Sequence, residues 1–338
     1  MRVGLGMAAL GRPGYINLQR DNHLTSRSVE GMQSQANSVI DALFQQAKSL
    51  SERDNILVPW LDCARSYGLS EKFVGEYLRS NNVCPTAVYV SSKWGYSYVA
   101  NWNVELDEGE PHEVKDHSLE NFLKQVEETS EHIGDYVNLY QVHSATFDSG
   151  ILTNSDVHEA LSNCRKERGW KIGLSVSGPS QDEVIRAAMK IKVNDEERLF
   201  DSVQCTYNIF EQRPHDALIE ASNAGMDVII KEGLANGRTL SNPTLLKLSS
   251  TLNCQPDQLA LAAILAQPFQ PRVLSGSVTA DQLISNLGSF YSIDDDVISI
   301  ADQLVSTTEG KEVLQQLMES CKMESVNYWN DRSALKWN

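Results

Sequence analysis

The sequence predicts an α/β barrel of eight parallel strands, a (β/α)8 or TIM barrel, and three observations lead to this fold class. Short β-rich runs alternate with helical patterns along nearly the whole chain, and eight of each can be identified. The chain has 338 residues, 41% of them hydrophobic, and one domain of that size is expected mainly for a closed, repeated architecture. The competing fold, an open doubly wound sheet, usually has fewer strands and a visible nucleotide fingerprint.

Each predicted strand is a short run of apolar and β-branched residues, and each predicted helix has apolar residues at a spacing of three to four. The strands are expected at Val3–Ala8, Ile56–Asp62, Val88–Lys93, Val137–His143, Lys171–Ser175, Ser202–Tyr207, Asp227–Lys231 and Arg272–Ser275. The helices are expected at Ser34–Ser49, Ser70–Arg79, Ser118–His132, Asn154–Lys166, Ser180–Lys190, Glu211–Ala224, Pro256–Ala266 and Ala280–Leu287.

We expect a single domain over residues 1–338, with a barrel core over about 3–290 and a C-terminal extension over 291–338. A helical pattern covers Leu304–Met318, and the extension ends with tyrosine and tryptophan side chains at 328, 329 and 337. Aromatic residues at that density usually pack against something. The tail is therefore predicted to dock on the barrel's own rim or on a partner.

A glycine-rich stretch near the start fits a dinucleotide fingerprint only in part. Residues Gly4–Ala9 match G-x-G-x-x-A after a short strand. The chain then runs into Gly11-Arg12-Pro13-Gly14 instead of a helix, and no acid ends a second strand at the expected distance. We interpret the stretch as the first strand of a barrel.

Two connections are longer than those of most barrels. They cover residues 11–34 and 95–117, and both follow the carboxyl ends of strands on the same face. One interpretation is that they wall a substrate pocket, and the other is that they are ordinary surface insertions.

Charge and composition exclude several classes of function. The formal net charge is −16, which argues against nucleic acid or an anionic membrane as the main partner. The longest unbroken apolar run, Leu259–Ala266, is too short to span a bilayer, and no targeting segment stands out. The six cysteines are scattered without close pairs, as in proteins of a reducing compartment. We expect a soluble cytoplasmic protein.

Four polar residues at neighbouring strand ends indicate chemistry. Asp62 ends the second predicted strand, Tyr67 follows it, Lys93 ends the third, and His143 ends the fourth. Neighbouring strands lie about 4.8 Å apart, so these side chains can meet. A buried lysine needs a counter-ion, which Asp62 can supply. A phenol beside that ammonium is expected to have a pKa below its usual value of about 10, which suits proton transfer.

Taken singly, each of the four residues has a structural explanation. Asp62 could cap the next helix, Tyr67 could be an ordinary loop aromatic, and Lys93 could extend to the rim. His143 alone would more often be a satisfied core histidine than a catalyst. The grouping of all four residues at successive strand ends favours a functional site.

Residues 62–71 read D-x-A-R-x-Y-G-x-S-E, which closely resembles the strand–loop–helix signature of the aldo-keto reductase family. The resemblance implies that Tyr67 is the general acid and base and that Lys93, held by Asp62, lowers its pKa. It implies that His143 orients the carbonyl or assists proton transfer. It also implies hydride transfer from a nicotinamide cofactor and no metal.

The resemblance extends to residues that would hold the cofactor, with departures. Ser175 and Gln204 match residues that contact the carboxamide, but Val176 replaces the asparagine that usually follows the serine. Leu234 matches a backbone contact to the pyrophosphate. Lys231 stands where the family usually has an aromatic that stacks on the nicotinamide ring.

The stretch 273–286 resembles the motif that binds the adenosine end at a helix N-terminus. Its candidate contacts are Gly276, Ser277, Thr279, Gln282 and Asn286. Gly276 and Gln282 stand where NADPH-preferring members often have Lys and Arg for the 2′-phosphate. By family habit we expect NADP(H), with NAD(H) as the alternative.

Three functions follow. The leading one is an NAD(P)(H)-dependent oxidoreductase that reduces aldehydes, ketones or sugar carbonyls. Its expected substrate is a small carbonyl or alcohol, with no nucleic acid or membrane as a partner, and the sequence leaves the oligomeric state open. The first alternative is an NAD-dependent sugar dehydrogenase working in the oxidative direction. The second is a cofactor-binding regulatory or sensor subunit with little turnover.

Overall fold

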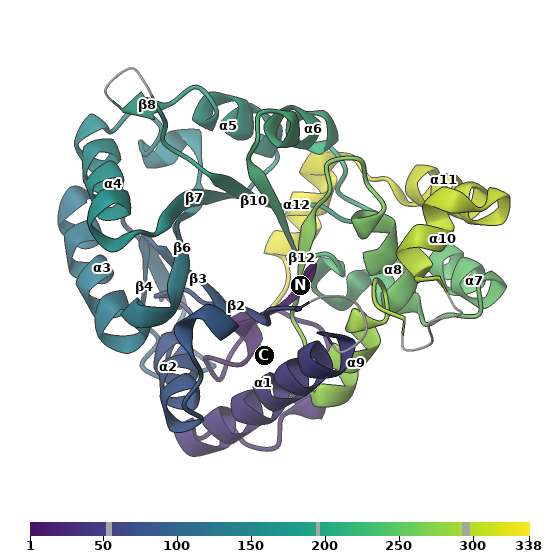
Figure 1. Cartoon of the computed structure of the whole chain (residues 1–338), viewed down its shortest axis with the longest axis horizontal. Helices are drawn as coiled ribbons and strands as arrows, with labels where there is room; N and C mark the ends of the chain where they lie inside the picture. Colours follow the sequence, from purple (N-terminus) through teal and green to yellow (C-terminus); the bar gives the residue numbers. More distant parts are fainter. Residues whose placement is uncertain (52–55, 194–196, 293–297) are drawn as a thin grey trace.

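The computed structural model describes residues 1–51, 56–193, 197–292 and 298–338, and its main feature is a closed barrel of eight parallel strands (Figure 1). In chain order the strands are β1 (Val3–Gly6), β2 (Trp60–Asp62), β3 (Tyr89–Trp94), β6 (Val137–Ala145), β7 (Lys171–Val176), β10 (Ser202–Thr206), β11 (Asp227–Lys231) and β12 (Arg272–Ser275). The barrel closes where β1 pairs with β12, with Val3 opposite Val273. The predicted fold class is confirmed.

Helices surround the barrel, as Figure 1 shows in a view down its short axis. Those of the repeated units are α1 (Val29–Ser51), α2 (Ser70–Ser80), α3 (Leu119–Ile133), α4 (Ser155–Arg168), α5 (Gln181–Ala188), α6 (His215–Asn223), α8 (Pro256–Leu265) and α9 (Ala280–Leu287). The others are α7 (Pro243–Thr251), α10 (Ile300–Ser306), α11 (Thr308–Cys321) and α12 (Ser325–Ser333). None of the helices described here combines the length and the apolar character needed to cross a membrane.

Packing inside the barrel explains the glycine-rich first strand. Trp60, Leu139, Ile229 and Leu274 form a small buried cluster of their own. A Cβ added to Gly4 would collide with the ring of Trp60, so only glycine leaves room for that indole. Gly4 is therefore required for packing, which agrees with the interpretation of the glycine-rich stretch as the first barrel strand.

Most predicted elements are present, with shifted ends. The second strand begins at Trp60 instead of Ile56, whose side chain is 87% exposed. The first helix begins at Val29, five residues before the predicted start. The helix predicted over 304–318 is two helices, because Thr307 ends α10 and its side chain caps the N-terminus of α11 through the Gly310 N–H.

The two long connections and the C-terminal extension meet over one end of the barrel. The connection after β3 carries a small hairpin of β4 (Tyr96–Tyr98) and β5 (Glu113–Lys115). The chain end pairs with the first connection, since the backbones of Tyr15 and Asn338 exchange hydrogen bonds of 3.0 and 2.9 Å. The aromatic tail therefore docks on the barrel's own rim, one of the two alternatives left by the sequence.

Candidate active site

The predicted quartet of Asp62, Tyr67, Lys93 and His143 comes together at the carboxyl ends of β2, β3 and β6. Lys93 is fully buried; its ammonium donates to a carboxylate oxygen of Asp62 and, at 3.0 Å, to the carbonyl of Cys63. The Lys93 ammonium lies 4.9 Å from the ring centroid of Tyr67, and the rings of Tyr67 and His143 meet edge to face at 5.5 Å. The ion pair expected between Lys93 and Asp62 is present.

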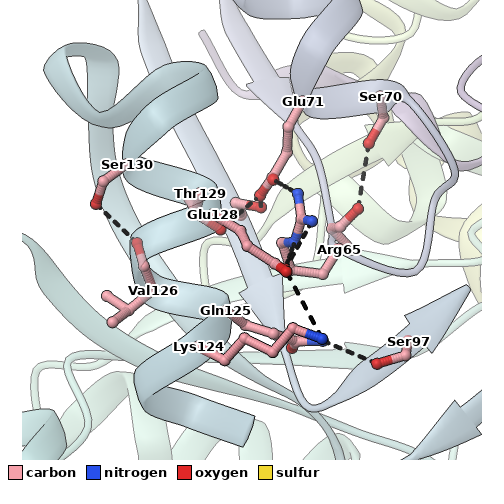
Figure 2. Close-up of polar contacts among 12 residues, drawn as sticks. Arg65, Ser70, Glu71, Ser97, Lys124, Gln125, Val126, Glu128, Thr129 and Ser130 are labelled. Carbon is pink, nitrogen blue, oxygen red and sulfur yellow. Dashed lines mark hydrogen bonds and ion pairs between the residues drawn. The ribbon is translucent and has the colours of Figure 1, made fainter.

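The loop that carries Tyr67 is fixed by a buried polar network. Figure 2 shows the guanidinium of Arg65 between Glu71 and Glu128, with ion pairs of 2.5 and 2.8 Å. Glu71 is only 2% exposed, and its other oxygen accepts hydrogen bonds from Ser92 on β3 and Thr129 on α3. The arginine and glutamate of the signature string thus anchor the loop to the strand and helix beside it. Their role is to hold the loop, which the sequence did not indicate.

The pKa of Tyr67 differs from the sequence-based expectation. Burial raises this pKa well above its ordinary value, and the negative charge of Asp62 adds to the effect. Lys93 donates its hydrogen bonds to Asp62 and to the Cys63 carbonyl, and its positive charge does not outweigh burial and the charge of Asp62 at the phenol. The expected lowering by Lys93 is therefore wrong for the protein without ligands. Tyr67 is a protonated phenol at neutral pH.

His143 is a neutral imidazole. Burial lowers its pKa well below the ordinary value, and the nearby cations Lys93, Lys231 and Arg12 lower it further. Its Nδ1 faces the hydroxyl of Ser66 at 3.4 Å. A neutral imidazole can donate or accept a hydrogen bond without carrying charge into the site.

A cavity of about 960 Å³ opens above these residues, at the upper end of the size range of ligand sites. Tyr67 and His143 line it at one end, and Gln282 and Asn286 on α9 line it at the other. Both long connections contribute to the wall, for example through Arg12 and residues of the β4–β5 hairpin. Both connections therefore line a cavity, as the first of the two interpretations requires.

The wall near Tyr67 carries further charged pairs. Arg12, 2% exposed, pairs with Glu113 at 2.8 Å, and its guanidinium lies 4.6 to 5.4 Å from the ring centroids of three aromatics. Those aromatics are Tyr15, Tyr67 and Trp337. On the opposite side, Arg332 of α12 pairs with Glu232 at 2.7 Å. Burial alone would raise the pKa of Glu232, but Arg332 and Lys231 outweigh it and lower that pKa to about 2.

The predicted cofactor residues divide into two groups. The cavity is lined by Gln204, Lys231, Leu234, Gly276, Ser277, Gln282 and Asn286, whereas Ser175 and Thr279 are not among its lining residues. Ser175 accepts the Ser144 N–H at 2.8 Å, and Thr279 caps α9. The amide nitrogen of Gln204 faces Asp62 at 3.4 Å.

The far end of the cavity, at α9, is lined by hydrogen-bonded polar groups and by acids. Asn286 accepts hydrogen bonds from Ser275 and Ser277 and donates to Asp257 at 2.7 Å. The cavity wall formed by α8, β12, α9 and the segment between β12 and α9 includes Asp257 and Asp281 but no Lys or Arg.

Sequence reasoning did not identify which residues of the C-terminal tail line the cavity. Trp329, Arg332 and Trp337 line the cavity near the quartet. The indole ring of Trp329 lies 5.7 Å from the ammonium of Lys231, so an aromatic does stand beside Lys231, but it comes from α12. The only signal in the sequence was the aromatic density of the tail, which does not indicate where the tail docks.

Among the residues described, no three His, Cys, Asp or Glu side chains gather as a metal site would require. A search of curated proteins finds no match. The model of the aldo/keto reductase family matches residues 33–306.

Two solved structures illustrate the similarity of fold. The aldo-keto reductase AKR11C1 from Bacillus halodurans, in its holo form, is 20% identical with a TM-score of 0.65, covering 96% of this chain and 94% of that one. MGS-M4, an aldo-keto reductase enzyme from a Medee basin deep-sea metagenome library, is 17% identical with a TM-score of 0.58, covering 94% and 91%. Because the family model matches most of the chain, this protein belongs to the aldo/keto reductase family.

Proposed function

We propose that this protein reduces the carbonyl group of a small molecule to an alcohol, with Tyr67 as the proton donor. The observation that carries the proposal is a protonated phenol that lines a large cavity next to a neutral imidazole. No hydrogen bond from the Tyr67 hydroxyl to another described residue is present, so the hydroxyl is available to a ligand. Family membership supports oxidoreductase chemistry of this kind.

The residues of the quartet have separate tasks in this proposal. The neutral imidazole of His143 orients the carbonyl oxygen, and the hydroxyl of Tyr67 donates its proton to that oxygen as negative charge develops. Lys93 supplies a fixed positive charge 4.9 Å from the Tyr67 ring centroid, which stabilises the phenolate that is left. Asp62 is the counter-ion of Lys93 and holds its ammonium in position.

The cavity fits a nicotinamide dinucleotide, which supplies a hydride when bound. Its volume is sufficient, and it extends from Tyr67 to α9. Three buried polar atoms of lining residues have no hydrogen-bond partner among the residues described: the indole nitrogen of Trp329, the side-chain oxygen of Asn236 and the Nε of Arg12. Ser277, Gln282 and Asn286 would hold the adenosine end.

The acids at the far end favour NAD(H) over NADP(H). Asp257 and Asp281 would repel a 2′-phosphate, and the described lining residues of α8, β12, α9 and the β12–α9 segment include no Lys or Arg to bind it. This reverses the preference expected from family habit. It also supports a second function, an NAD-dependent dehydrogenase that oxidises a sugar or another alcohol.

The pH dependence of kcat/KM tests whether the protein works mainly as a reductase or as a dehydrogenase. A phenol with a raised pKa is ready to donate a proton but must lose one before it can accept one. Reduction should keep its kcat/KM within about twofold between pH 6 and pH 9, whereas oxidation should become faster as the pH rises.

The experiment for the proposed function uses the purified protein, reduced NAD or NADP, and a panel of aldehydes, ketones and aldoses. Continuous consumption of the reduced cofactor is expected with at least one carbonyl, and with lower KM for NADH. Tight cofactor binding with a single turnover and no steady rate would support the sensor alternative. Absence of both binding and turnover would contradict the proposal.

A further inference from the structure

Lys231, the last residue of β11, differs from the other cations around Tyr67 and His143. Lys93, Arg12 and Arg332 each have a carboxylate partner. Lys231 lines the same cavity, and no described carboxylate lies within ion-pair distance of its ammonium. Its hydrogen bond goes to the neutral hydroxyl of Thr206, at 2.8 Å.

Glu232, the neighbour of Lys231 in sequence, is not its counter-ion. The Glu232 carboxylate accepts three hydrogen bonds from the guanidinium of Arg332, at 2.7 to 3.1 Å. The side chains of Glu232 and Lys231 share the hydroxyl of Thr206, which lies 3.4 Å from a Glu232 oxygen, and their charges influence each other's pKa without direct contact. The positive charge of Lys231 is therefore left without a direct carboxylate partner among the described residues.

The surroundings of Lys231 shield its ammonium from water. The ring of Trp329 covers the ammonium at 5.7 Å, and burial lowers the pKa of Lys231. In such surroundings an unpaired ammonium is costly, and an anion that approaches it is bound more strongly than it would be in water.

The position of Lys231 links it to the reacting group of a ligand. The ammonium is close enough to His143 to lower the pKa of that imidazole, and both residues line the cavity. A carbonyl held by His143 and Tyr67 would thus have the Lys231 ammonium beside the rest of a small molecule.

We propose that Lys231 selects carbonyl substrates that carry a carboxylate, such as short oxo acids with an aldehyde at one end. This inference rests on the proposed function and names its substrate class. The ammonium of Lys231 forms an ion pair with the carboxylate, and Trp329 packs against the carbon chain between the two groups. The pyrophosphate of the cofactor is the competing anion for the same lysine, and the experiment separates the two.

The experiment compares succinate semialdehyde with its uncharged methyl ester, methyl 4-oxobutanoate. The wild-type protein should have a kcat/KM at least about tenfold higher for the acid, as expected for one hydrogen-bonded charge pair. In Lys231→Met the ratio of the two values should fall to about 1, whereas Lys231→Arg should keep most of the preference. The ratio cancels any loss that affects both substrates equally.

A matched control removes the same charge from the opposite end of the barrel. Lys171 begins β7 and is exposed, with its ammonium paired to Asp227 at 3.2 Å. Lys171→Met should leave the preference for the acid unchanged. A preference that falls equally in both variants would point to the overall charge of the protein and would contradict the proposal.

Binding measurements complete the test independently of turnover. Calorimetric titration with 4-hydroxybutyrate, the expected product, should give at least about tenfold weaker binding to Lys231→Met than to the wild type. Equal affinity would overturn the inference, even if no carbonyl is reduced. The inference would also fail if Lys231→Met weakens binding of NAD or NADP and leaves the acid-to-ester ratio intact. Turnover of both substrates without preference would overturn it and leave the proposed function standing.

Discussion

The two ends of the cavity differ in how their charged side chains are paired. Around Tyr67, three cations are held by carboxylates, in the pairs of Lys93 with Asp62, Arg12 with Glu113 and Arg332 with Glu232. Around α9, the polar lining groups are mostly hydroxyls and amides, and the described residues of that wall include the acids Asp257 and Asp281 but no Lys or Arg. Proton transfer needs fixed charges in a dry site, whereas binding a nucleotide needs mainly hydrogen bonds.

The two ends also differ in their origin along the chain. The far end is built from a contiguous stretch, β12 to α9, with help from α8. The end at Tyr67 combines residues from both termini: Arg12 precedes Arg332 by 320 positions, and both line the same cavity. The specific wall of the site therefore depends on how the chain ends dock.

The largest expected effect on stability comes from breaking the buried pair at the reacting end. Asp62→Asn leaves the fully buried Lys93 without its counter-ion, and we expect the free energy of unfolding to fall by about 3–5 kcal/mol. Asp281→Asn, in the exposed first turn of α9, should cost no more than about 1 kcal/mol. Denaturant unfolding of the two variants checks this contrast, and equal losses would contradict it.

Acid pH should weaken the same end of the barrel through His117. Its Nε2 donates to the carbonyl of His143 at 2.9 Å, its Nδ1 has no partner among the described residues, and burial lowers its pKa to about 4. The unfolded chain takes up this proton near pH 6.5, so stability is present above that pH and is lost as the pH falls toward 4. The loss attributable to this residue is about 3 kcal/mol.

The measurement is denaturant unfolding at pH 7 and pH 4 for the wild type and His117→Gln. The variant should lose about 3 kcal/mol less over this range. His132→Gln, at the C-terminal end of α3, serves as the control for removing a less buried histidine. The same pH dependence in all three proteins would rule out the role given to His117.

A smaller effect is expected from adding a cation to the far end. Gln282→Arg should tighten binding of NADP relative to NAD by about tenfold, the effect of one hydrogen bond to a charged phosphate. Gln282→Met removes the amide without adding charge and should leave the ratio of the two dissociation constants unchanged. Fluorescence titration measures both, and an unchanged ratio in Gln282→Arg would place the 2′-phosphate elsewhere.

The barrel and the quartet could be predicted because they depend on local patterns. An apolar run that ends in a polar residue marks a strand end, and parallel strands bring their ends to one face. Asp62 ends β2 as predicted, whereas Lys93 and His143 lie one and two residues before the ends of β3 and β6, close enough to reach the same face. The loop string around Tyr67 completes the prediction.

The other features of the site, its tail residues and the pKa of Tyr67, depend on contacts that no local sequence pattern reveals. Trp329 and Arg332 lie in a polar, aromatic helix whose docking site is set by Glu232, about 100 positions earlier. The shift of the Tyr67 pKa is predicted in the wrong direction, because the sequence shows which charges lie near the phenol but not how deeply the phenol is buried. Burial and the charge of Asp62 both raise this pKa, and together they outweigh Lys93.

The most direct test of the central claim is the rate of reduction in a single turnover, started by mixing an aldehyde with protein saturated with reduced cofactor. Tyr67→Phe removes only the hydroxyl and should slow the loss of reduced cofactor by about 10²- to 10⁴-fold. Tyr77→Phe removes the same atom from α2, where the hydroxyl donates to Asp41 at 2.6 Å, and should change the rate by less than about twofold. Equal rates in the wild type and Tyr67→Phe would show that the proton comes from another group.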